Sequence, residues 1–258
     1  MNSLTWKRFI GKFFRAVPER KIILIYHAVG NGPWAISENN FKQQIQWLKS
    51  NAKIVSLTEL LTTPLKKNTT EVALTFDDGY ACLYDIVAPI LKAENVTAIV
   101  YINSGWMSDN NTHKASRTDL GHYPDEKFLT WDEVKQLDQQ GWEIGSHGVD
   151  HLDLTTCDQS IVKNELTASK KIIEDKLQKN CNHFAYTFGK HTPEVRQAVN
   201  DAGYRYAVAA QHQPHKNTDD LMMLPRLYVG KNFTLHDFKN TVSGKWDFIG
   251  HVQKIKGY

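Results

Sequence analysis

The sequence predicts an α/β fold in which helices pack around a parallel β-sheet. Short apolar runs alternate along the chain with segments of helical periodicity, which is the pattern of repeated strand–helix units. No Gly/Ser-rich or Pro-rich linker, low-complexity stretch or internal repeat divides the chain. Its 258 residues suit one large domain, and α/β barrels of this size are common. We therefore predict an amphipathic N-terminal segment over residues 1–20 and one large domain over residues 21–258.

The predicted strands are short apolar runs bounded by polar residues. In chain order they are residues 22–26, 53–56, 72–76, 97–101, 143–145, 183–186 and 206–208.

The predicted helices fall between these strands. In chain order they are residues 38–50, 84–94, 131–140, 158–178 and 193–202. Thr130 and Glu133 form a capping-box pattern at the start of the third helix, and Gly141 ends it.

The N-terminal segment has two interpretations. Trp6, Phe9, Ile10, Phe13 and Phe14 could share one face of a helix that carries basic residues elsewhere. Such a helix either packs its aromatic face on the barrel or lies on an anionic membrane surface. Neither an export signal nor a run of about 18 apolar residues is recognised. We therefore expect a cytoplasmic protein, attached peripherally at the inner membrane face if the helix binds lipid.

Composition argues against some classes of protein. The net charge is only +3, and no block of Lys and Arg is interleaved with aromatic residues, so we expect no nucleic-acid partner. Cys82, Cys157 and Cys181 are odd in number and form no C-x-x-C pair. We expect three unpaired thiols rather than a disulfide framework or a thiolate metal site.

Polar residues follow the predicted strands where these end. His27 follows the first strand, Asp77 and Asp78 follow the third, and His147 comes soon after the fifth. In α/β barrels, residues at the carboxyl ends of different strands meet at one mouth. Adjacent carboxylates repel unless a cation or hydrogen bonds separate their roles. The alternative reading of Asp77 and Asp78 is a helix N-cap with an acidic first turn.

A second motif contains two histidines four residues apart. Imidazoles with the spacing of His147 and His151 can reach one metal ion from the same helical face or tight loop. With a carboxylate from the first motif they complete a His/His/Asp set that leaves positions open for water and substrate.

These motifs resemble those of the polysaccharide deacetylases, carbohydrate esterase family four. The resemblance rests on residues 75–80 (TFDDGY) and 146–151 (SHGVDH), and it extends over about residues 20–230. Further segments that fall in the family's order are residues 25–29, 41–57, 184–189, 202–204 and 225–226. The branch it resembles most deacetylates poly-N-acetylglucosamine exopolysaccharides and related lipid-linked sugars. The fold implied is a distorted (β/α) barrel of polysaccharide-deacetylase type with about seven parallel strands.

The resemblance also implies roles for individual residues. Asp78, His147 and His151 would bind one divalent metal ion, with Asp77 as general base and His27 as general acid. Zn²⁺ suits two imidazoles and a carboxylate best, and Co²⁺, Ni²⁺, Fe²⁺ and Mn²⁺ are alternatives.

Five further residues are expected around the substrate. The backbone N–H of Phe188 would bind the oxyanion. Arg226 would supply a positive charge near Asp77, unless it forms an ordinary ion pair elsewhere. Tyr80 is a candidate contact for the sugar, as are Trp34 and Trp106, which lie in loop-like surroundings.

The chain departs from the family pattern in the residues that orient the site. Ala185 stands where an Arg commonly holds the base, and Thr187 stands where a Pro is usual. A late Leu-x-x-x-His motif is absent, and the fourth motif is unrecognisable around Asp201. We expect residues 109–127 to form a lid. His212 and His215 are expected to be solvated.

The function expected is removal of the N-acetyl group from an N-acetylated amino sugar in a polysaccharide, glycolipid or lipid-linked sugar. One alternative is a catalytically silent sugar-binding protein on the same fold. Another is a metal hydrolase that acts on a different amide.

Overall fold

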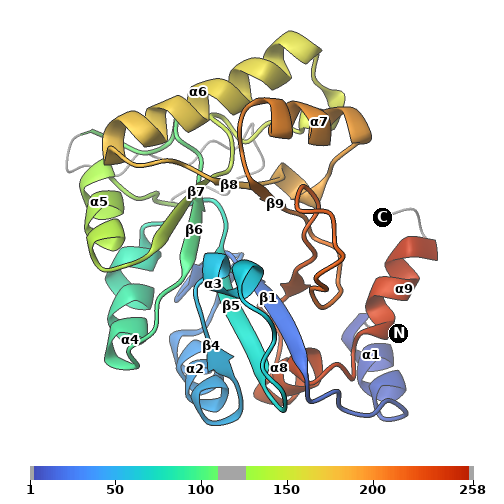
Figure 1. Ribbon diagram of the computed structural model, residues 1–258. Helices are drawn as coiled ribbons and strands as arrows, with labels where there is room; N and C mark the ends of the chain where they lie inside the picture. Colours follow the sequence, from blue (N-terminus) through green and yellow to red (C-terminus); the bar gives the residue numbers. More distant parts are fainter. Residues whose placement is uncertain (1–2, 110–125, 256–258) are drawn as a thin grey trace.

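The predicted fold class is confirmed by the computed structural model, which describes residues 3–109 and 126–255 (Figure 1). Parallel strands form one curved sheet, a half-barrel, in the order β10-β1-β5-β6-β7-β8-β9, with β4 paired to β5. The strands are β1 (Arg20–Tyr26), β4 (Lys53–Ile54), β5 (Thr70–Phe76), β6 (Ile99–Ile102), β7 (Glu143–Ser146), β8 (His183–Ala185), β9 (Tyr206–Val208) and β10 (Leu227–Tyr228). Two short strands, β2 (Ala28–Val29) and β3 (Ala35–Ile36), pair separately.

Helices surround this sheet (Figure 1). The longer ones are α1 (Ser3–Gly11), α2 (Glu38–Asn51), α5 (Trp131–Gln139), α6 (Gln159–Leu177), α7 (Pro193–Asp201), α8 (Leu235–Val242) and α9 (Phe248–Ile255). The shorter ones are α3 (Leu57–Thr62), the π-turn η1 (Leu83–Val87) with α4 (Ala88–Ala93), and the 3₁₀ turns η3 (Leu154–Thr156) and η4 (Thr187–Gly189). Among the described residues, no helix is both long and apolar enough to cross a membrane.

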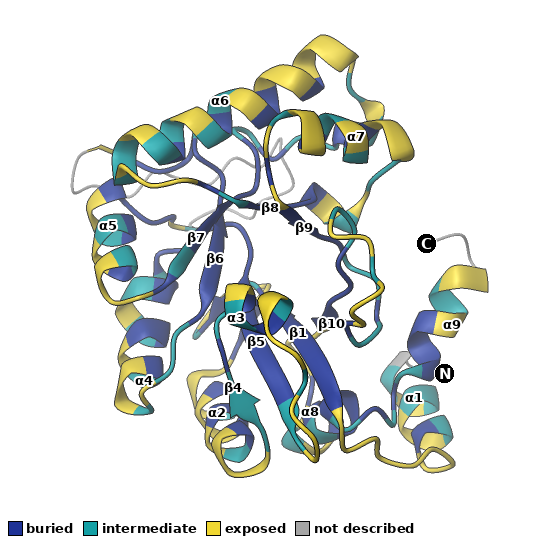
Figure 2. Ribbon diagram, viewed as in Figure 1, coloured by how far each residue is buried: buried dark blue, intermediate teal, exposed yellow. Residues whose placement is uncertain are grey.

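The strands are buried on both faces (Figure 2), because each face meets its own apolar cluster. Successive residues of a strand point to opposite sides. Ile22 and Leu24 of β1 accordingly pack toward the helices, whereas Ile23 belongs to a second cluster with Ala73 and Ile99. This second cluster takes residues from five strands and fills the concave side, so the barrel interior is a packed core.

Helix α3 closes the end of the barrel at which the strands begin. Leu57 and Leu60 of α3 belong to the interior cluster. The Glu143 carboxylate at the start of β7 accepts the Leu57 and Thr58 N–H groups, at 2.8 and 3.2 Å. Thr58 Oγ1 also lies 3.0 Å from His183 Nε2 at the start of β8. The sequence analysis missed α3 because six residues are too few for a periodicity signal.

Residues 224–228 run between the two edges of the sheet. Leu224 forms a parallel bridge with Val208 of β9, and Leu227 and Tyr228 pair with β1. We call residues 224–228 the seam. Its strand β10 was not predicted, because two paired residues leave no alternation to detect. Arg226 lies in the middle of the seam, and its side chain is fully buried.

The other differences from prediction are local. All seven predicted strands are present with shifts at their ends, and so are the five predicted helices, although the second begins as a π-turn. Helices α8 and α9 were not predicted. The expectation that His212 and His215 are solvated is wrong: both are buried, and His215 Nδ1 lies 3.1 Å from the Asp219 carboxylate. All three cysteines are free, as predicted.

Candidate metal centre and active site

The predicted catalytic and metal-binding residues lie where the strands end. His27 follows β1, Asp77 and Asp78 follow β5, and His147 follows β7. Because these strands are parallel neighbours in the order β1-β5-β6-β7, their carboxyl ends share one edge. The opposite end of the barrel is covered by α3, so the site is at the open end.

Asp77 is held by Arg226 across the barrel. Arg226 donates from Nη1 to Asp77 Oδ1 at 2.6 Å and from Nη2 to Oδ2 at 2.8 Å, a paired geometry that fixes the carboxylate plane. The guanidinium is itself fixed, because Nε donates to the Ala209 carbonyl and Nη1 also reaches Thr75 Oγ1. The structure thus brings the seam arginine to the predicted base.

The charge state of Asp77 follows from this pairing. Burial opposes ionisation, but the Arg226 charge and its hydrogen bonds hold the pKa of Asp77 below its usual value. Asp77 is therefore an ionised acceptor at neutral pH. Tyr26 pairs with Phe76, and the Asp77 N–H donates to the Tyr26 carbonyl, so His27 and Asp77 leave neighbouring strands at the same level.

Asp78, His147 and His151 form a buried cluster suited to a metal ion. Each offers one ligand atom, and these atoms lie within 4.8 Å of one another. Asp78 Oδ1 is 3.4 Å from Nε2 of His147 and 3.4 Å from Nε2 of His151. Two ligand atoms that are each about 2.0–2.1 Å from a tetrahedral ion lie about 3.3–3.4 Å apart. The spacing therefore fits a single divalent ion.

Two further observations support that fit. Asp78 Oδ1 is buried and has no hydrogen-bond donor among the described residues, although an uncompensated carboxylate oxygen is costly there. His147 Nδ1 lies 2.8 Å from the Ala185 carbonyl, so the ring donates through Nδ1 and turns the Nε2 lone pair toward Asp78. Ala185, which replaces the family's usual arginine, thus orients a predicted ligand through its backbone.

The backbone adopts uncommon conformations at two of these three residues. Asp78 and His151 both have positive φ, at 72° and 58°. Such angles cost energy in non-glycine residues and persist only where the surroundings enforce them. Gly148 also has positive φ, and it turns the chain between the two histidines.

Glu165 of α6 stabilises the turn between His147 and His151. The sequence analysis missed this residue. Its Oε2 accepts the N–H groups of Val149 at 2.8 Å and Asp150 at 3.1 Å, directly before His151. Burial raises the pKa of Glu165, although these hydrogen bonds oppose the shift. A signal was present in the sequence, because Glu165 shares the buried face of α6 with Val162 and Leu166. An acidic residue on an apolar helix face needs a partner.

The rim of the site carries aromatic side chains. The His27 ring lies 6.2 Å from that of Trp34 and 6.4 Å from that of Tyr228, centroid to centroid. Trp34 is exposed, and its role as a sugar contact stays a prediction. Trp106, by contrast, is buried, with its ring 4.7 Å from Phe128 and 5.5 Å from His151. Trp106 was also a candidate sugar contact, but its burial leaves no ring face exposed for a sugar.

Tyr80 and Phe188 lie on different sides of the cluster. Tyr80 is buried and stacks on Phe128, so it offers no exposed face for a sugar ring; burial and the neighbouring Asp78 charge raise the pKa of its hydroxyl. Phe188 is exposed, with its ring centroid 4.6 Å from that of His151 and its backbone at φ 57°. Its predicted role through the backbone N–H stays a prediction. The predicted lid at 109–127 lies largely outside the described residues.

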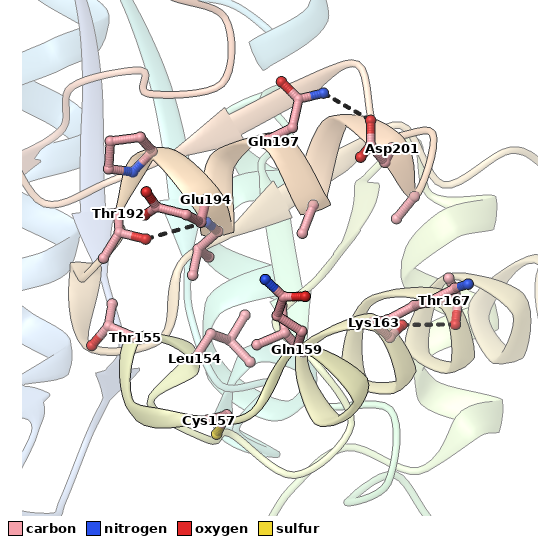
Figure 3. Close-up of a pocket in the computed structure, with 15 residues that line it drawn as sticks. Leu154, Thr155, Cys157, Gln159, Lys163, Thr167, Thr192, Glu194, Gln197 and Asp201 are labelled. Carbon is pink, nitrogen blue, oxygen red and sulfur yellow. Dashed lines mark hydrogen bonds between the residues drawn. The ribbon is translucent and has the colours of Figure 1, made fainter.

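A cavity of about 970 Å³ lies elsewhere, between η3, α6 and α7 (Figure 3). Leu154, Gln159 and Lys163 line it on one side, and Thr192 and Glu194 on the other. None of the predicted catalytic or metal-binding residues is among its lining residues. The site is thus identified by its chemistry rather than by the size of a cavity.

Comparisons with known proteins agree with this geometry. The polysaccharide deacetylase family profile matches residues 65–207, a range that contains both predicted motifs but neither His27 nor Arg226. A putative polysaccharide deacetylase, YxkH, of Bacillus subtilis (strain 168) is 26% identical over 219 residues, covering 82% of this chain and 72% of its own length. A poly-β-1,6-N-acetyl-D-glucosamine N-deacetylase of Staphylococcus aureus (strain MRSA252) is 24% identical over 227 residues, with 83% and 72% covered.

Solved structures share the fold. The Streptococcus pyogenes deacetylase PplD, in complex with acetate, superposes with a TM-score of 0.72 at 23% identity, over 88% of this chain and 99% of that one. A de-N-acetylase from Aggregatibacter actinomycetemcomitans gives a TM-score of 0.74 at 24% identity, over 86% and 100%.

Proposed function

The chain belongs to the polysaccharide deacetylase family, and we propose that it is a metal-dependent hydrolase that removes the N-acetyl group from an N-acetylated amino sugar. One observation carries the proposal: a buried Asp78/His147/His151 cluster with metal-ligand spacing stands beside an ionised Asp77 at the open end of the barrel. The substrate class is a polysaccharide, a glycolipid or a lipid-linked sugar. The names of the two relatives, a putative polysaccharide deacetylase and a poly-β-1,6-N-acetyl-D-glucosamine N-deacetylase, support a polysaccharide among these three.

Each residue of the site has a separate role in the proposed reaction. Asp78, His147 and His151 would hold a divalent ion, which would supply Lewis-acid polarisation of the amide carbonyl. Asp77, ionised and aligned by Arg226, accepts a proton from the water that attacks the carbonyl carbon, a role worth roughly 10²–10⁴ in rate. The N–H of Phe188 donates to the developing oxyanion.

His27 is the proposed general acid. When the C–N bond breaks, the sugar nitrogen must gain a proton, and His27 near the two carboxylates is the proposed donor. Acetate and the free amine are then the two products. Arg226 takes the place of the arginine that the family usually carries at position 185, where this chain has Ala185.

The test measures bound metal and acetate release together, on the wild type and on Asp77→Asn. The substrates are N-acetylglucosamine oligomers and a lipid-linked N-acetylhexosamine. We expect about one metal ion per chain, a count set by the single three-ligand site. We also expect acetate release that Asp77→Asn abolishes without loss of metal.

Each other result has a defined meaning. If the wild type binds metal but releases no acetate from any of these substrates, the amide is not that of an amino sugar. If it binds no metal at saturating zinc, the hydrolase proposal fails and a sugar-binding role replaces it.

A further inference from the structure

The end of α1 and the turn after it expose a group of large apolar side chains. Phe9 is 61% exposed and Phe13 75%, and Phe14 and Val17 are also exposed. We call these four residues the aromatic tip. The Phe9 and Phe13 rings contact each other edge to face, with centroids 5.6 Å apart. Four large apolar residues exposed within nine positions form a patch of the kind that marks an interaction surface.

The exposure does not result from a loosely attached helix. Arg8 donates from Nε and Nη2 to the buried Asp237 carboxylate of α8, at 2.8 and 2.6 Å. The Trp6 ring meets Phe248 of α9 edge to face at 5.6 Å. At Gly11, a Cβ would lie 2.7 Å from Trp246 Nε1, so the helix backbone rests directly on that indole.

The aromatic residues that the sequence placed on one helical face are therefore in two different environments in the structure. Trp6 and Ile10 pack on the protein, whereas Phe9 and Phe13 point away from it. Figure 2 shows exposed positions on α1, which lies next to the start of α9. The helix is fixed by one face, and its other face is presented outward.

The charged residues within the segment that carries the aromatic tip are of one sign. Residues 3–18 contain four basic residues and no acidic one. Arg8 is paired with Asp237, which leaves Lys12 and Arg15 exposed beside the aromatic rings. The next acidic residue, Glu19, accepts the backbone N–H of Asn68. Exposed aromatic rings flanked by Lys and Arg match the two layers of an anionic lipid surface.

We propose that the aromatic tip is a membrane anchor that inserts Phe9 and Phe13 into the headgroup–acyl boundary of a bilayer containing anionic lipid. Lys12 and Arg15 then face the lipid phosphates, and the Arg8–Asp237 pair fixes the angle at which the protein stands on the surface. This binding is independent of catalysis, so it can hold or fail whatever the outcome of the acetate assay.

The test is co-sedimentation of the full chain with vesicles. One set contains phosphatidylcholine with about 30% phosphatidylglycerol, and the other contains phosphatidylcholine alone. We expect binding to the first set, with at least about tenfold loss in Phe9→Ser/Phe13→Ser, since the double variant removes two inserted rings. Lys12→Gln/Arg15→Gln should lose roughly 25-fold on anionic vesicles, about fivefold for each basic residue.

The matched control removes exposed apolar side chains elsewhere. Ile161→Ser/Leu221→Ser changes two residues that are 42% and 45% exposed and lie outside the aromatic tip, and it should bind as the wild type does. Phe13→Ser alone serves as the milder variant if the double substitution lowers the melting temperature.

Three results would overturn the proposal. The wild type could fail to bind anionic vesicles, the phenylalanine variants could bind them equally well, or the control could lose as much binding. Sedimentation velocity tests whether a second copy of this chain, instead of a membrane, covers the aromatic tip. A wild-type dimer that Phe9→Ser/Phe13→Ser dissociates, without vesicle binding, would make the aromatic tip a contact between copies of this chain.

Discussion

Removing the Arg226 side chain tests the central ion pair of the site. The guanidinium and the Asp77 carboxylate are both buried, and two hydrogen bonds of 2.6 and 2.8 Å join them. In Arg226→Met the carboxylate stays buried without its partner, which costs about 3–5 kcal/mol. At roughly 2–4 °C per kcal/mol for a chain of this size, the melting temperature should fall by roughly 6–20 °C.

A double-mutant cycle separates the pair from its surroundings. Asp77→Val leaves the buried arginine without its partner, so it should lower the free energy of unfolding about as much as Arg226→Met does. Asp77→Val/Arg226→Met removes both charges, and its cost should not exceed that of either single variant, a coupling of at least about 2 kcal/mol. The contacts that Arg226 makes to Ala209 and Thr75 are lost in both arginine variants, so the cycle cancels them.

The assay is urea unfolding of the metal-free protein, so that no metal charge acts on Asp77. Lys171→Met is the control, because Lys171 pairs with Asp175 at the surface, where both side chains are more than half exposed. It should change the free energy of unfolding by less than about 0.5 kcal/mol. A loss below about 1 kcal/mol in Arg226→Met, or additive costs in the cycle, would refute the reasoning.

The remaining predictions concern the turn before His151, the metal ion and two further histidines. Glu165→Ala should weaken metal binding about 10- to 100-fold in calorimetric titration, because it removes the oxygen that accepts the two N–H groups of that turn, whereas Asp175→Ala on the same helix should not. Metal at about 100 times its Kd should raise the free energy of unfolding by about 2.7 kcal/mol; a rise that persists in His151→Ala would contradict the assigned site. Burial, with Lys7 and Arg20 nearby, lowers the pKa of His212 to about 3, below its unfolded value of about 6.5. The unfolded chain therefore binds the proton first, and the stability present above about pH 6.5 is lost as the pH falls toward 3; at pH 5 the loss is about 2 kcal/mol, and His212→Leu should remove this dependence in urea unfolding. His27→Ala should keep less than roughly a third of kcat on the preferred substrate if His27 is the acid; a higher value would exclude that role.

The sequence was informative wherever one short segment carries the whole signal. The buried strand β5 and the carboxylates after it are adjacent, so one stretch of residues predicts both the strand and the position of Asp77 and Asp78. The spacing of His147 and His151 likewise lies within one turn. These local patterns predicted the fold class and the cluster now seen with metal-ligand spacing.

Features that depend on distant contacts were harder to predict. Arg226 meets Asp77 across 149 positions of the chain, and only the resemblance to a family suggested that the two might be near. Glu165 is 15 and 16 positions from the N–H groups that it accepts. The two-residue strand β10 and the six-residue helix α3 form because the rest of the barrel offers them partners. His212 and His215 looked solvated because their neighbours in sequence are polar, but tertiary packing covers them.

The location of α3 affects how the family's fold can vary. This helix joins the first residues of β7 and β8 through Glu143 and His183, and Lys21 of β1 donates to the Thr63 carbonyl just after it. Those contacts tie α3 to the first residues of three strands, at the end of the sheet opposite the metal cluster. The seam that carries Arg226 pairs with β1, whose other neighbour is β5, so strand pairing sets the distance between Arg226 and Asp77. Loops around the opening can therefore change in length and composition while that distance stays constant.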